Sequence, residues 1–140
     1  MTILQPPGWP RPKGYACGVA ASGTIVFVSG QIGWDEQGRF VARDIVGQVR
    51  QALRNIITIV AQAGGGSEHI ARMTWYVVDK EEYLAAQREI GRVYREVMGR
   101  HYPAMSVVGV SALLEADAHV EIEATAIIPS RAVASGVSGG

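Results

Sequence analysis

The chain has one cysteine, Cys17, and no net charge, because its 13 lysines and arginines balance its 13 aspartates and glutamates. A single cysteine excludes an intramolecular disulfide and any metal site built from several cysteines, and it favours a reducing, cytoplasmic location. Balanced charge gives no overall field that would attract nucleic acid or an anionic membrane. No apolar run approaches the roughly 20 residues that a membrane-spanning helix needs. We therefore expect neither a nucleic-acid nor a membrane partner.

The 140 residues, 48% of them hydrophobic, are enough for one domain with one core. We place this domain at residues 13–130. Residues 1–12 are rich in proline and predict an extended arm, without the basic segment and apolar run of a signal peptide. Residues 131–140 are small and rich in glycine, which predicts a flexible tail.

Apolar spacing and β-branched residues predict the order strand, strand, helix, strand, helix, strand, strand. The first two strands are expected to pair as a hairpin across the turn that ends at Gly23. Asp44 and Asp79 are each suited to cap the first turn of a helix. Strands are expected at 15–20, 24–29, 72–78, 105–110 and 118–128, and helices from 45 to the glycines at 64–66 and from 80 to about 98. The order predicts an α+β domain, with one sheet and two helices on one of its faces.

The expected sheet has chemically different faces. Side chains alternate along a strand, so Glu121 and Glu123 share one face of the last strand, opposite Ile122. The three strands before it carry large apolar groups on both faces, Phe27 and Trp75 among them. One face packs on the helices, and the other would stay exposed in a monomer. Exposed apolar area of that extent usually marks an interface, which predicts an oligomer.

Several segments, taken together and in order, resemble one family. They are Val26–Ile32, Gln48–Ile56, a strand that ends at Asp79, Tyr102–Val108 and the closing strand His119–Ile128. They are similar to the RidA family, also called YjgF, over roughly residues 15–128. The resemblance implies a chorismate-mutase-like fold of the bacillus type, a homotrimer around a central barrel, ligand clefts between subunits, and no cofactor.

The resemblance also implies site residues. In deaminating members an arginine binds the substrate carboxylate, and a glutamate of the last strand positions the water that attacks an imine or enamine. Glu121 matches that glutamate, Gly30 the glycine of the Ser-Gly-Gln loop, and Tyr15 an aromatic residue near the first strand. Met105 stands in place of the arginine, and Val107 where a cysteine is common. A thioether carries no charge and cannot bind a carboxylate as a guanidinium does.

These departures, together with Gly109 where a glutamate is often found, predict a larger and more apolar pocket. Trp34 is a candidate wall of it, because loops at strand ends often present side chains to ligands; alternatively, it caps an apolar edge. We expect a substrate with an aromatic or extended unsaturated skeleton, such as 2-aminomuconate, and little deamination of 2-aminoacrylate. The ligand's acid group could be held by backbone amides or by Arg88, Arg92 or Arg100.

Three function classes stay open. The chain could be a hydrolase or deaminase that uses Glu121 on imines or enamines, or a trimer that binds a metabolite without turnover. The third class is an endoribonuclease, but the sequence has no basic stripe and no paired histidines that would support this activity. Glu121 could instead pair with Arg72, Arg100 or a basic residue of another subunit. Cys17 is more typical of a buried small hydrophobe than of a nucleophile. His101 and His119 have no partners at ligand spacing, so we expect no metal site.

Overall fold

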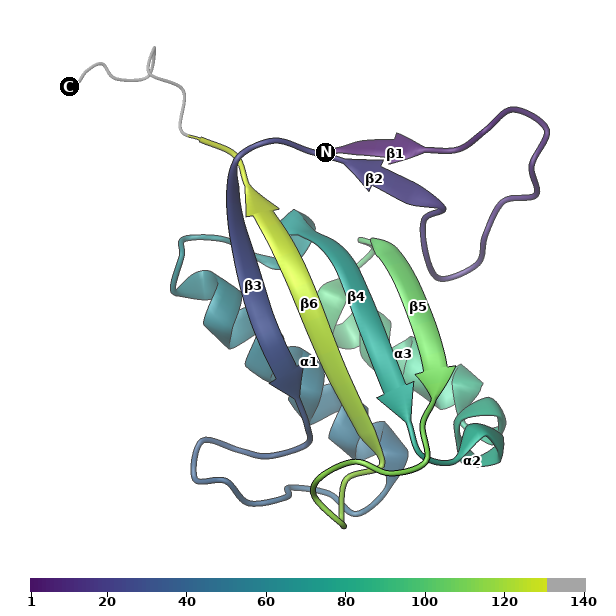
Figure 1. The fold of residues 1–140 in the computed structure, drawn as a ribbon, viewed down its shortest axis with the longest axis vertical. Helices are drawn as coiled ribbons and strands as arrows, with labels where there is room; N and C mark the ends of the chain where they lie inside the picture. Colours follow the sequence, from purple (N-terminus) through teal and green to yellow (C-terminus); the bar gives the residue numbers. More distant parts are fainter. Residues whose placement is uncertain (131–140) are drawn as a thin grey trace.

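The structure, a computed structural model, describes residues 1–130; the tail predicted at 131–140 lies outside them. The main sheet has the order β3-β6-β4-β5 (Figure 1). β4 and β5 run parallel, whereas β6 pairs antiparallel with both β3 and β4. The strands are β3 (Thr24–Gln31), β4 (Ile70–Val77), β5 (Ala104–Gly109) and β6 (Val120–Ile128).

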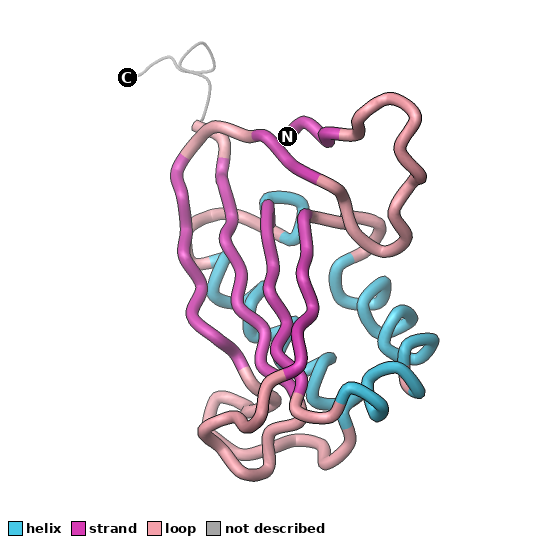
Figure 2. Tube along the Cα trace, turned by 45° about the vertical axis from the view of Figure 1, so that its right-hand side comes forward, coloured by secondary structure: helices cyan, strands magenta, loops and turns pink. Residues whose placement is uncertain are grey.

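Helices cover one face of this sheet. They are α1 (Ile45–Ala61), α2 (Lys80–Ala85) and α3 (Gln87–Met98), with a single 3-10 turn, η1 (Ser67–His69), before β4. Figure 2 shows them on the same side of the strands. Within residues 1–130 the fold is therefore α+β, and this prediction is confirmed.

The caps form as expected. The Asp44 side chain accepts a hydrogen bond from Gly47 N (3.3 Å) at the start of α1, and Asp79 accepts one from Glu82 N (3.1 Å) at the start of α2. The single helix predicted from 80 to 98 is wrong, because it breaks at Ala86, whose φ and ψ are −99° and 5°. Alanine is a strong helix former, so nothing in the local sequence announces this break.

The predicted hairpin between the first two strands is also wrong. β2 (Gly18–Ala20) pairs with β1 (Thr2–Leu4), which lies in the N-terminal arm, and β3 pairs with β6. Ala16 N donates to Pro103 O (2.9 Å), which holds the chain beside the start of β5, at the opposite edge of the sheet from β3. In this position β2 pairs with β1 of the N-terminal arm, whereas the partner of β3 is β6, about 100 residues further along the chain.

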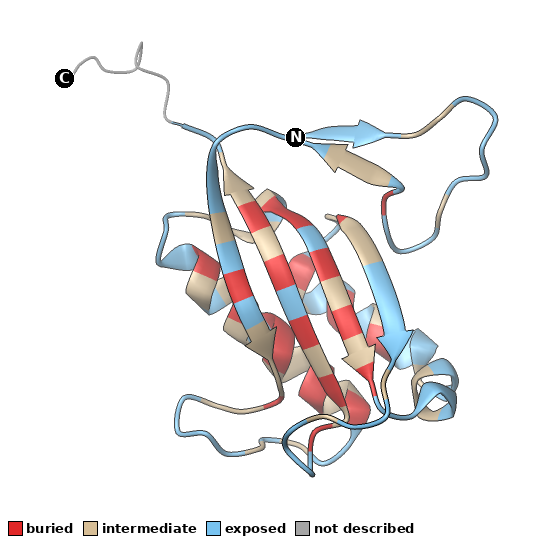
Figure 3. Ribbon diagram, viewed as in Figure 1, coloured by how far each residue is buried: buried red, intermediate tan, exposed pale blue. Residues whose placement is uncertain are grey.

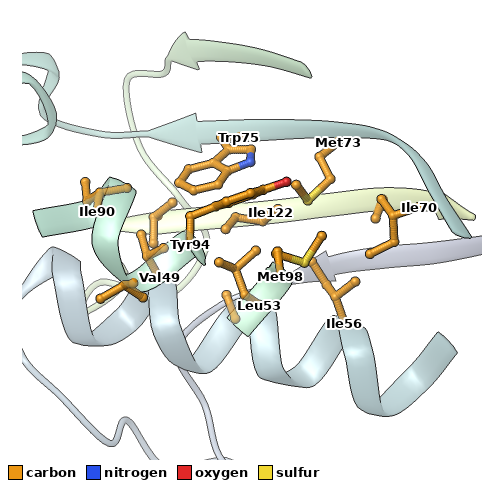
Figure 4. Packing of buried hydrophobic residues seen from close by; sticks show 14 of the residues in the cluster. Val49, Leu53, Ile56, Ile70, Met73, Trp75, Ile90, Tyr94, Met98 and Ile122 are labelled. Atoms are coloured by element: carbon orange, nitrogen blue, oxygen red, sulfur yellow. The ribbon is translucent and has the colours of Figure 1, made fainter. Parts of the chain in front are cut away.

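The core fills the space between the sheet and the helices (Figure 4). Gln48 is buried in this core, and both polar atoms of its side-chain amide form hydrogen bonds. Nε2 donates to Ala42 O (3.2 Å) and Asp117 O (3.0 Å), and Oε1 accepts from His119 N (2.8 Å). These hydrogen bonds fix to α1 both the loop that precedes it and the loop that precedes β6. Buried amides that are fully paired in this way favour a single arrangement of the surrounding backbone.

The opposite face of the sheet exposes apolar side chains, as predicted. Along β6, buried and accessible residues alternate (Figure 3). On the face away from the helices, Phe27 is 80% exposed, Ile25 55% and Val108 41%. Trp75, by contrast, is buried on the helix side. The sheet therefore has one face packed against the helices and one face left uncovered in a single chain, where exposed apolar side chains lie beside the polar residues of β6.

Candidate functional site

The predicted site residues separate into two groups at opposite edges of the sheet. Tyr15, Met105 and Val107 line a cavity of about 470 Å³ beside β5, here called the aromatic pocket. Gly30, Trp34 and Glu121 line another of about 850 Å³ beside the end of β3, here called the acidic pocket. The structure brings the members of each group together, but it does not bring the two groups together within one chain.

Besides Tyr15, four aromatic rings line the first pocket. Trp75 and Tyr83 meet edge to face, with ring centroids 6.5 Å apart. Tyr94 and Tyr102 stack at 5.3 Å with an interplanar angle of 13°. Such pairs are favoured arrangements of aromatic quadrupoles. Burial raises the pKa of Tyr83 and of Tyr94, so both hydroxyls are neutral at physiological pH. Tyr94 uses its hydroxyl to donate to His101 O (2.7 Å).

Among residues 1–130, Lys13 and Arg95 are the charged residues that line the aromatic pocket, and no carboxylate of this part of the chain lines it. Sequence reasoning missed both, and it missed the four rings as a group. A signal for Arg95 was present, because Gln87, Gly91 and Arg95 recur every four residues and so share one stripe of α3. None of the arginines suggested from the sequence lines this pocket: Arg88 and Arg92 lie elsewhere on α3, and Arg100 borders a separate hollow under the arm.

Glu121 and Gly30 are in close contact at the edge of the acidic pocket. A Cβ atom built on Gly30 would lie 2.7 Å from Glu121 Cδ and 2.9 Å from its Cγ, so the carboxylate occupies the space that only a glycine leaves. Within residues 1–130 Glu121 forms no ion pair. The alternative that it pairs with Arg72 or Arg100 therefore does not hold inside the described chain.

Other carboxylates surround this glutamate. Asp35, Glu36 and Glu115 line the same pocket, together with Arg54. Backbone N–H groups of Arg39 and Gln37 donate to Asp35 and lower its pKa. Arg54 donates to Glu96 of α3 at 3.3 Å, so its charge is partly engaged elsewhere.

Trp34 lies between the acidic pocket and a neighbouring ring. It lines the acidic pocket, and it packs edge to face against Phe40 with centroids 5.9 Å apart. Asn55 of α1 fixes its position by donating to Trp34 O (2.7 Å) and Ile32 O (3.3 Å). The loop after β3 is therefore anchored to α1.

The face of β6 that carries Glu121 also carries Glu123, as the alternation predicted. Tyr76 lies opposite Glu121 in the register of β4 and β6. Partial desolvation, followed by the charges of Glu123 and Glu121, raises the pKa of Tyr76. Tyr76 therefore stays protonated beside two carboxylates.

Other features of the described chain add no further site. No cluster of three histidine, cysteine, aspartate or glutamate side chains in residues 1–130 could hold a metal ion. No helix in that part of the chain is long and apolar enough to span a membrane. Cys17 is exposed, so the expectation that it is buried is wrong. Its backbone lies next to Ala16, which is held at the sheet edge, and this turns the thiol outward.

The two pockets suit different chemistry. Aromatic walls with cations at the rim suit a flat anion, because rings stack on it and ammonium or guanidinium groups bind its charge. A carboxylate with no ion pair can orient a water molecule and accept its proton. A ligand could use both only where the two edges of the sheet meet, which a contact between two chains could provide.

Comparison with known sequences shows what this chain is similar to. A family model described as endoribonuclease L-PSP matches residues 10–128. The RutC family protein of Pasteurella multocida is 38% identical over 105 residues, which cover 75% of this chain and 81% of that protein. Reactive intermediate deaminase TdcF of Escherichia coli, whose name is provisional, is 35% identical over 108 residues, covering 75% of this chain and 80% of that protein.

Solved structures show the same likeness. YyfB of the Rid family, from Yersinia pestis, has a TM-score of 0.81 at 28% identity and covers 91% of this chain and 98% of its own. TdcF of E. coli with bound serine has a TM-score of 0.65 at 34% identity and covers 91% of this chain and 99% of its own. In both pairs the similarity extends over nearly the whole of each chain.

Proposed function

Because the chain belongs to the endoribonuclease L-PSP family, also called RidA or YjgF, we propose that it is a cofactor-free hydrolytic deaminase of imines and enamines. An enamine enters as its imine tautomer. The oxygen of water adds to the carbon of the C=N bond. The C–N bond then breaks, and the nitrogen leaves as ammonia with the two protons of the water, so a carbonyl compound remains. Glu121 orients the water and accepts its proton in the first step.

The contact between Gly30 and Glu121 carries this proposal. A general base must stand within hydrogen-bonding reach of its water in a fixed position. Gly30 lets the carboxylate lie against the end of β3, and the absence of an ion pair within residues 1–130 leaves its oxygens available. That a relative is called a reactive intermediate deaminase supports the same chemistry.

We further propose that the working cleft forms between subunits of a homotrimer. The aromatic and acidic pockets lie at opposite edges of one sheet. A head-to-tail contact joins different surfaces of identical chains and closes into a ring. Such a ring would place the aromatic pocket of one subunit against the acidic pocket of the next. It would also cover the exposed apolar face around Phe27.

The substrate skeleton follows from the aromatic pocket. Met105 and Val107 add apolar surface where the family resemblance expects an arginine and a cysteine, and four rings complete the wall. An aromatic ring of roughly 100 Å² gains on the order of 2–3 kcal/mol on burial at about 25 cal/mol per Å². This is comparable to one charge-assisted hydrogen bond. An aromatic or extended conjugated imine therefore fits better than 2-iminopropanoate.

The test uses imines made in place by an amino-acid oxidase from phenylalanine or from alanine, with release of the oxo acid followed by absorbance. We expect acceleration for the phenylalanine-derived imine and a loss of roughly 100-fold or more in Glu121→Gln. Glu123→Gln is the matched control, since it lies on the same face of the same strand, and it should change the rate less than threefold. An unchanged rate in Glu121→Gln would overturn the role of this residue.

A second variant tests the reason for the substrate preference. Met105→Arg places a guanidinium in the aromatic pocket, where it can bind a small carboxylate with two parallel hydrogen bonds. We expect it to bring detectable turnover of 2-iminopropanoate and to leave Glu121 essential. If it does not, Val107 and Gly109 have changed the pocket beyond a single missing charge.

A metabolite-binding trimer without turnover is the second candidate, and Met105 favours it because substrate orientation by an arginine is missing. It predicts that aromatic acids raise the unfolding temperature while no variant or substrate shows hydrolysis. The endoribonuclease activity in the family's description fits poorly, because the carboxylates of Asp35, Glu36, Glu115 and Glu121 line one pocket and repel phosphate groups.

A further inference from the structure

We propose that the aromatic pocket binds a planar aromatic or conjugated carboxylate, with the ring between the aromatic walls and the carboxylate bound by Arg95 and Lys13. This rests on the proposed function, because it names the ligand class of the same cleft. It assigns two residues that neither the sequence nor the family resemblance singled out. The positive charge that Met105 lacks is supplied from α3 and from the segment before β2.

The charges of the pocket carry the first step. Lys13 and Arg95 line it and no carboxylate does, so its potential is positive and favours an anion. Neither cation forms an ion pair within residues 1–130. Nearby arginines differ: Arg92 pairs with Glu89, and Arg50 with Glu96. Arg95 therefore keeps its donors for a ligand.

The helix gives Arg95 its position. The Arg95 guanidinium passes over Gly91, because Nη1 lies 3.6 Å from where a Cβ atom of that residue would stand. Gly91 lines the same pocket. Met105 lines it from the strand side. A carboxylate in this pocket therefore meets a cation from the helix side and apolar surface from β5.

The walls determine the shape of the ligand. A cavity of about 470 Å³ lies within the range of small-molecule sites. Its rings include a stacked pair and an edge-to-face pair. Trp75 and Tyr94 are buried behind Tyr83 and Tyr102, so Tyr15, Tyr83 and Tyr102 are the rings that a flat molecule can reach. Buried tyrosine hydroxyls stay neutral here, so they do not repel an anion.

The indole of Trp75 gives an independent indication of a ligand, because its N–H group has no hydrogen-bond partner in residues 1–130. Trp75 is 2% exposed, and its Nε1 is the buried side-chain nitrogen or oxygen in residues 1–130 that has no hydrogen-bond partner. Figure 4 shows this indole beside Tyr94 in the core. Buried indole N–H groups usually find a partner. An acceptor atom on a bound molecule would provide one after a small shift of the ring.

The experiment measures binding by calorimetry with benzoate, its neutral counterpart benzamide, and the non-aromatic cyclohexanecarboxylate. We expect benzoate to bind at least ten times more tightly than either of the others. Arg95→Gln and Lys13→Gln should each weaken benzoate binding by roughly 10- to 100-fold, as expected for a charge-assisted hydrogen bond, and leave benzamide binding unchanged. Arg88→Gln is the matched control, since Arg88 lies on the same helix outside the pocket. Equal benzoate affinity in wild type and Arg95→Gln would overturn the assignment.

The NMR signals of the indole N–H groups of Trp9, Trp34 and Trp75 give a second measurement of binding, and it needs no variant. Benzoate should shift the Trp75 signal, whereas a shift confined to Trp34 would place the ligand in the acidic pocket and contradict the proposal. Glu121→Gln separates the two proposals, because it should keep benzoate affinity within twofold. Benzoate binding without any turnover would overturn only the deaminase, and turnover without benzoate binding would overturn only the ligand assignment.

Discussion

The two pockets differ in almost every chemical respect. The aromatic pocket has two cations and no carboxylate, and its walls are rings. The acidic pocket has four carboxylates and one arginine, and amide side chains make up much of the rest. One is suited to hold a flat anion and the other to activate water. They lie at opposite edges of the sheet. Under the proposed function this placement would separate ligand binding from chemistry, and neither pocket of a single chain would be a complete deaminase site.

Two arginines illustrate this contrast. Arg54 borders the acidic pocket, but Glu96 of α3 accepts a hydrogen bond from it at 3.3 Å. Arg95 precedes Glu96 in the chain and borders the aromatic pocket, with no ion pair in residues 1–130. A cation with a nearby carboxylate mainly stabilises structure, whereas a free one at a cavity is available for a ligand.

The largest expected effect comes from keeping the two pockets apart. Phe27→Asp places a carboxylate among the exposed apolar side chains of the uncovered face, and its burial in a trimer would cost several kcal/mol. We expect monomers by light scattering and loss of imine hydrolysis, with a folded chain by circular dichroism because Phe27 is 80% exposed here.

Leu114→Asp is the control for Phe27→Asp. Leu114 is fully exposed but lies in the loop before β6 rather than on the sheet. This variant should keep both assembly and activity. A Phe27→Asp protein with an unchanged oligomeric state would show that the apolar face is not the interface.

The next effect is confined to the acidic pocket. In Gly30→Ala the new methyl group would lie 2.7 Å from Glu121 Cδ, so the carboxylate must move away. A misplaced base costs on the order of 100-fold in rate. We expect this loss in the imine assay, with benzoate affinity in the aromatic pocket unchanged. Equal losses of turnover and of benzoate affinity would show that the two pockets are not independent.

The sequence was sufficient to name Gly30 and Glu121 as candidates, but only through the family resemblance. Alternation along the last strand assigned Glu121 a face, whereas the contact between the two residues came from the structure. The sequence was not sufficient for Arg95 and Lys13, which come from segments about 80 residues apart. They line one cavity, where the hydrogen bond from Ala16 to Pro103 holds the segment of Lys13 beside β5, and such a long-range arrangement leaves no local signature.

Strand pairing shows the same limit. A short glycine turn predicts a hairpin from local sequence alone, but β3 pairs with β6 and β2 with the arm. The choice depends on which distant strand buries more apolar surface, and Val26 and Val28 of β3 pack opposite Ala126 and Ala124. The layers of the fold were predictable because they follow from apolar periodicity, whereas these partners were not.

A smaller effect distinguishes the glycines of the two pockets. Gly91 lies inside α3, and a Cβ atom there would meet only Arg95 Nη1, at 3.6 Å. Alanine is better than glycine in a helix by about 0.5–1 kcal/mol. We therefore expect Gly91→Ala to raise the free energy of unfolding in urea by about that amount, in contrast to Gly30→Ala. A loss of stability in Gly91→Ala would contradict this prediction, and would indicate that the glycine is needed for a contact that is absent from a single chain.

The smallest effect concerns the ion pair that joins the helices beside the two pockets. Glu96 of α3 binds Arg50 of α1 at 2.9 and 3.2 Å. The hydrogen bond from Arg50 lowers the pKa of Glu96 below its ordinary value of 4.5. A carboxyl group whose pKa is lower in the folded state stabilises the fold above its unfolded pKa and stops doing so as pH falls through its folded pKa.

Glu96→Gln should therefore lower the urea midpoint slightly at pH 7. The difference from wild type should shrink as pH falls below 4.5, and it should also shrink in about 0.5 M salt, because exposed pairs are screened. Glu89→Gln is the matched control, since Glu89 pairs with Arg92 inside α3 and does not link the helices. A difference that grew as pH fell would have the wrong sign for this ion pair. If Glu89→Gln lowered the urea midpoint as much as Glu96→Gln, the effect could not be assigned to the ion pair between α1 and α3. The connection between these two helices would then not depend on Glu96.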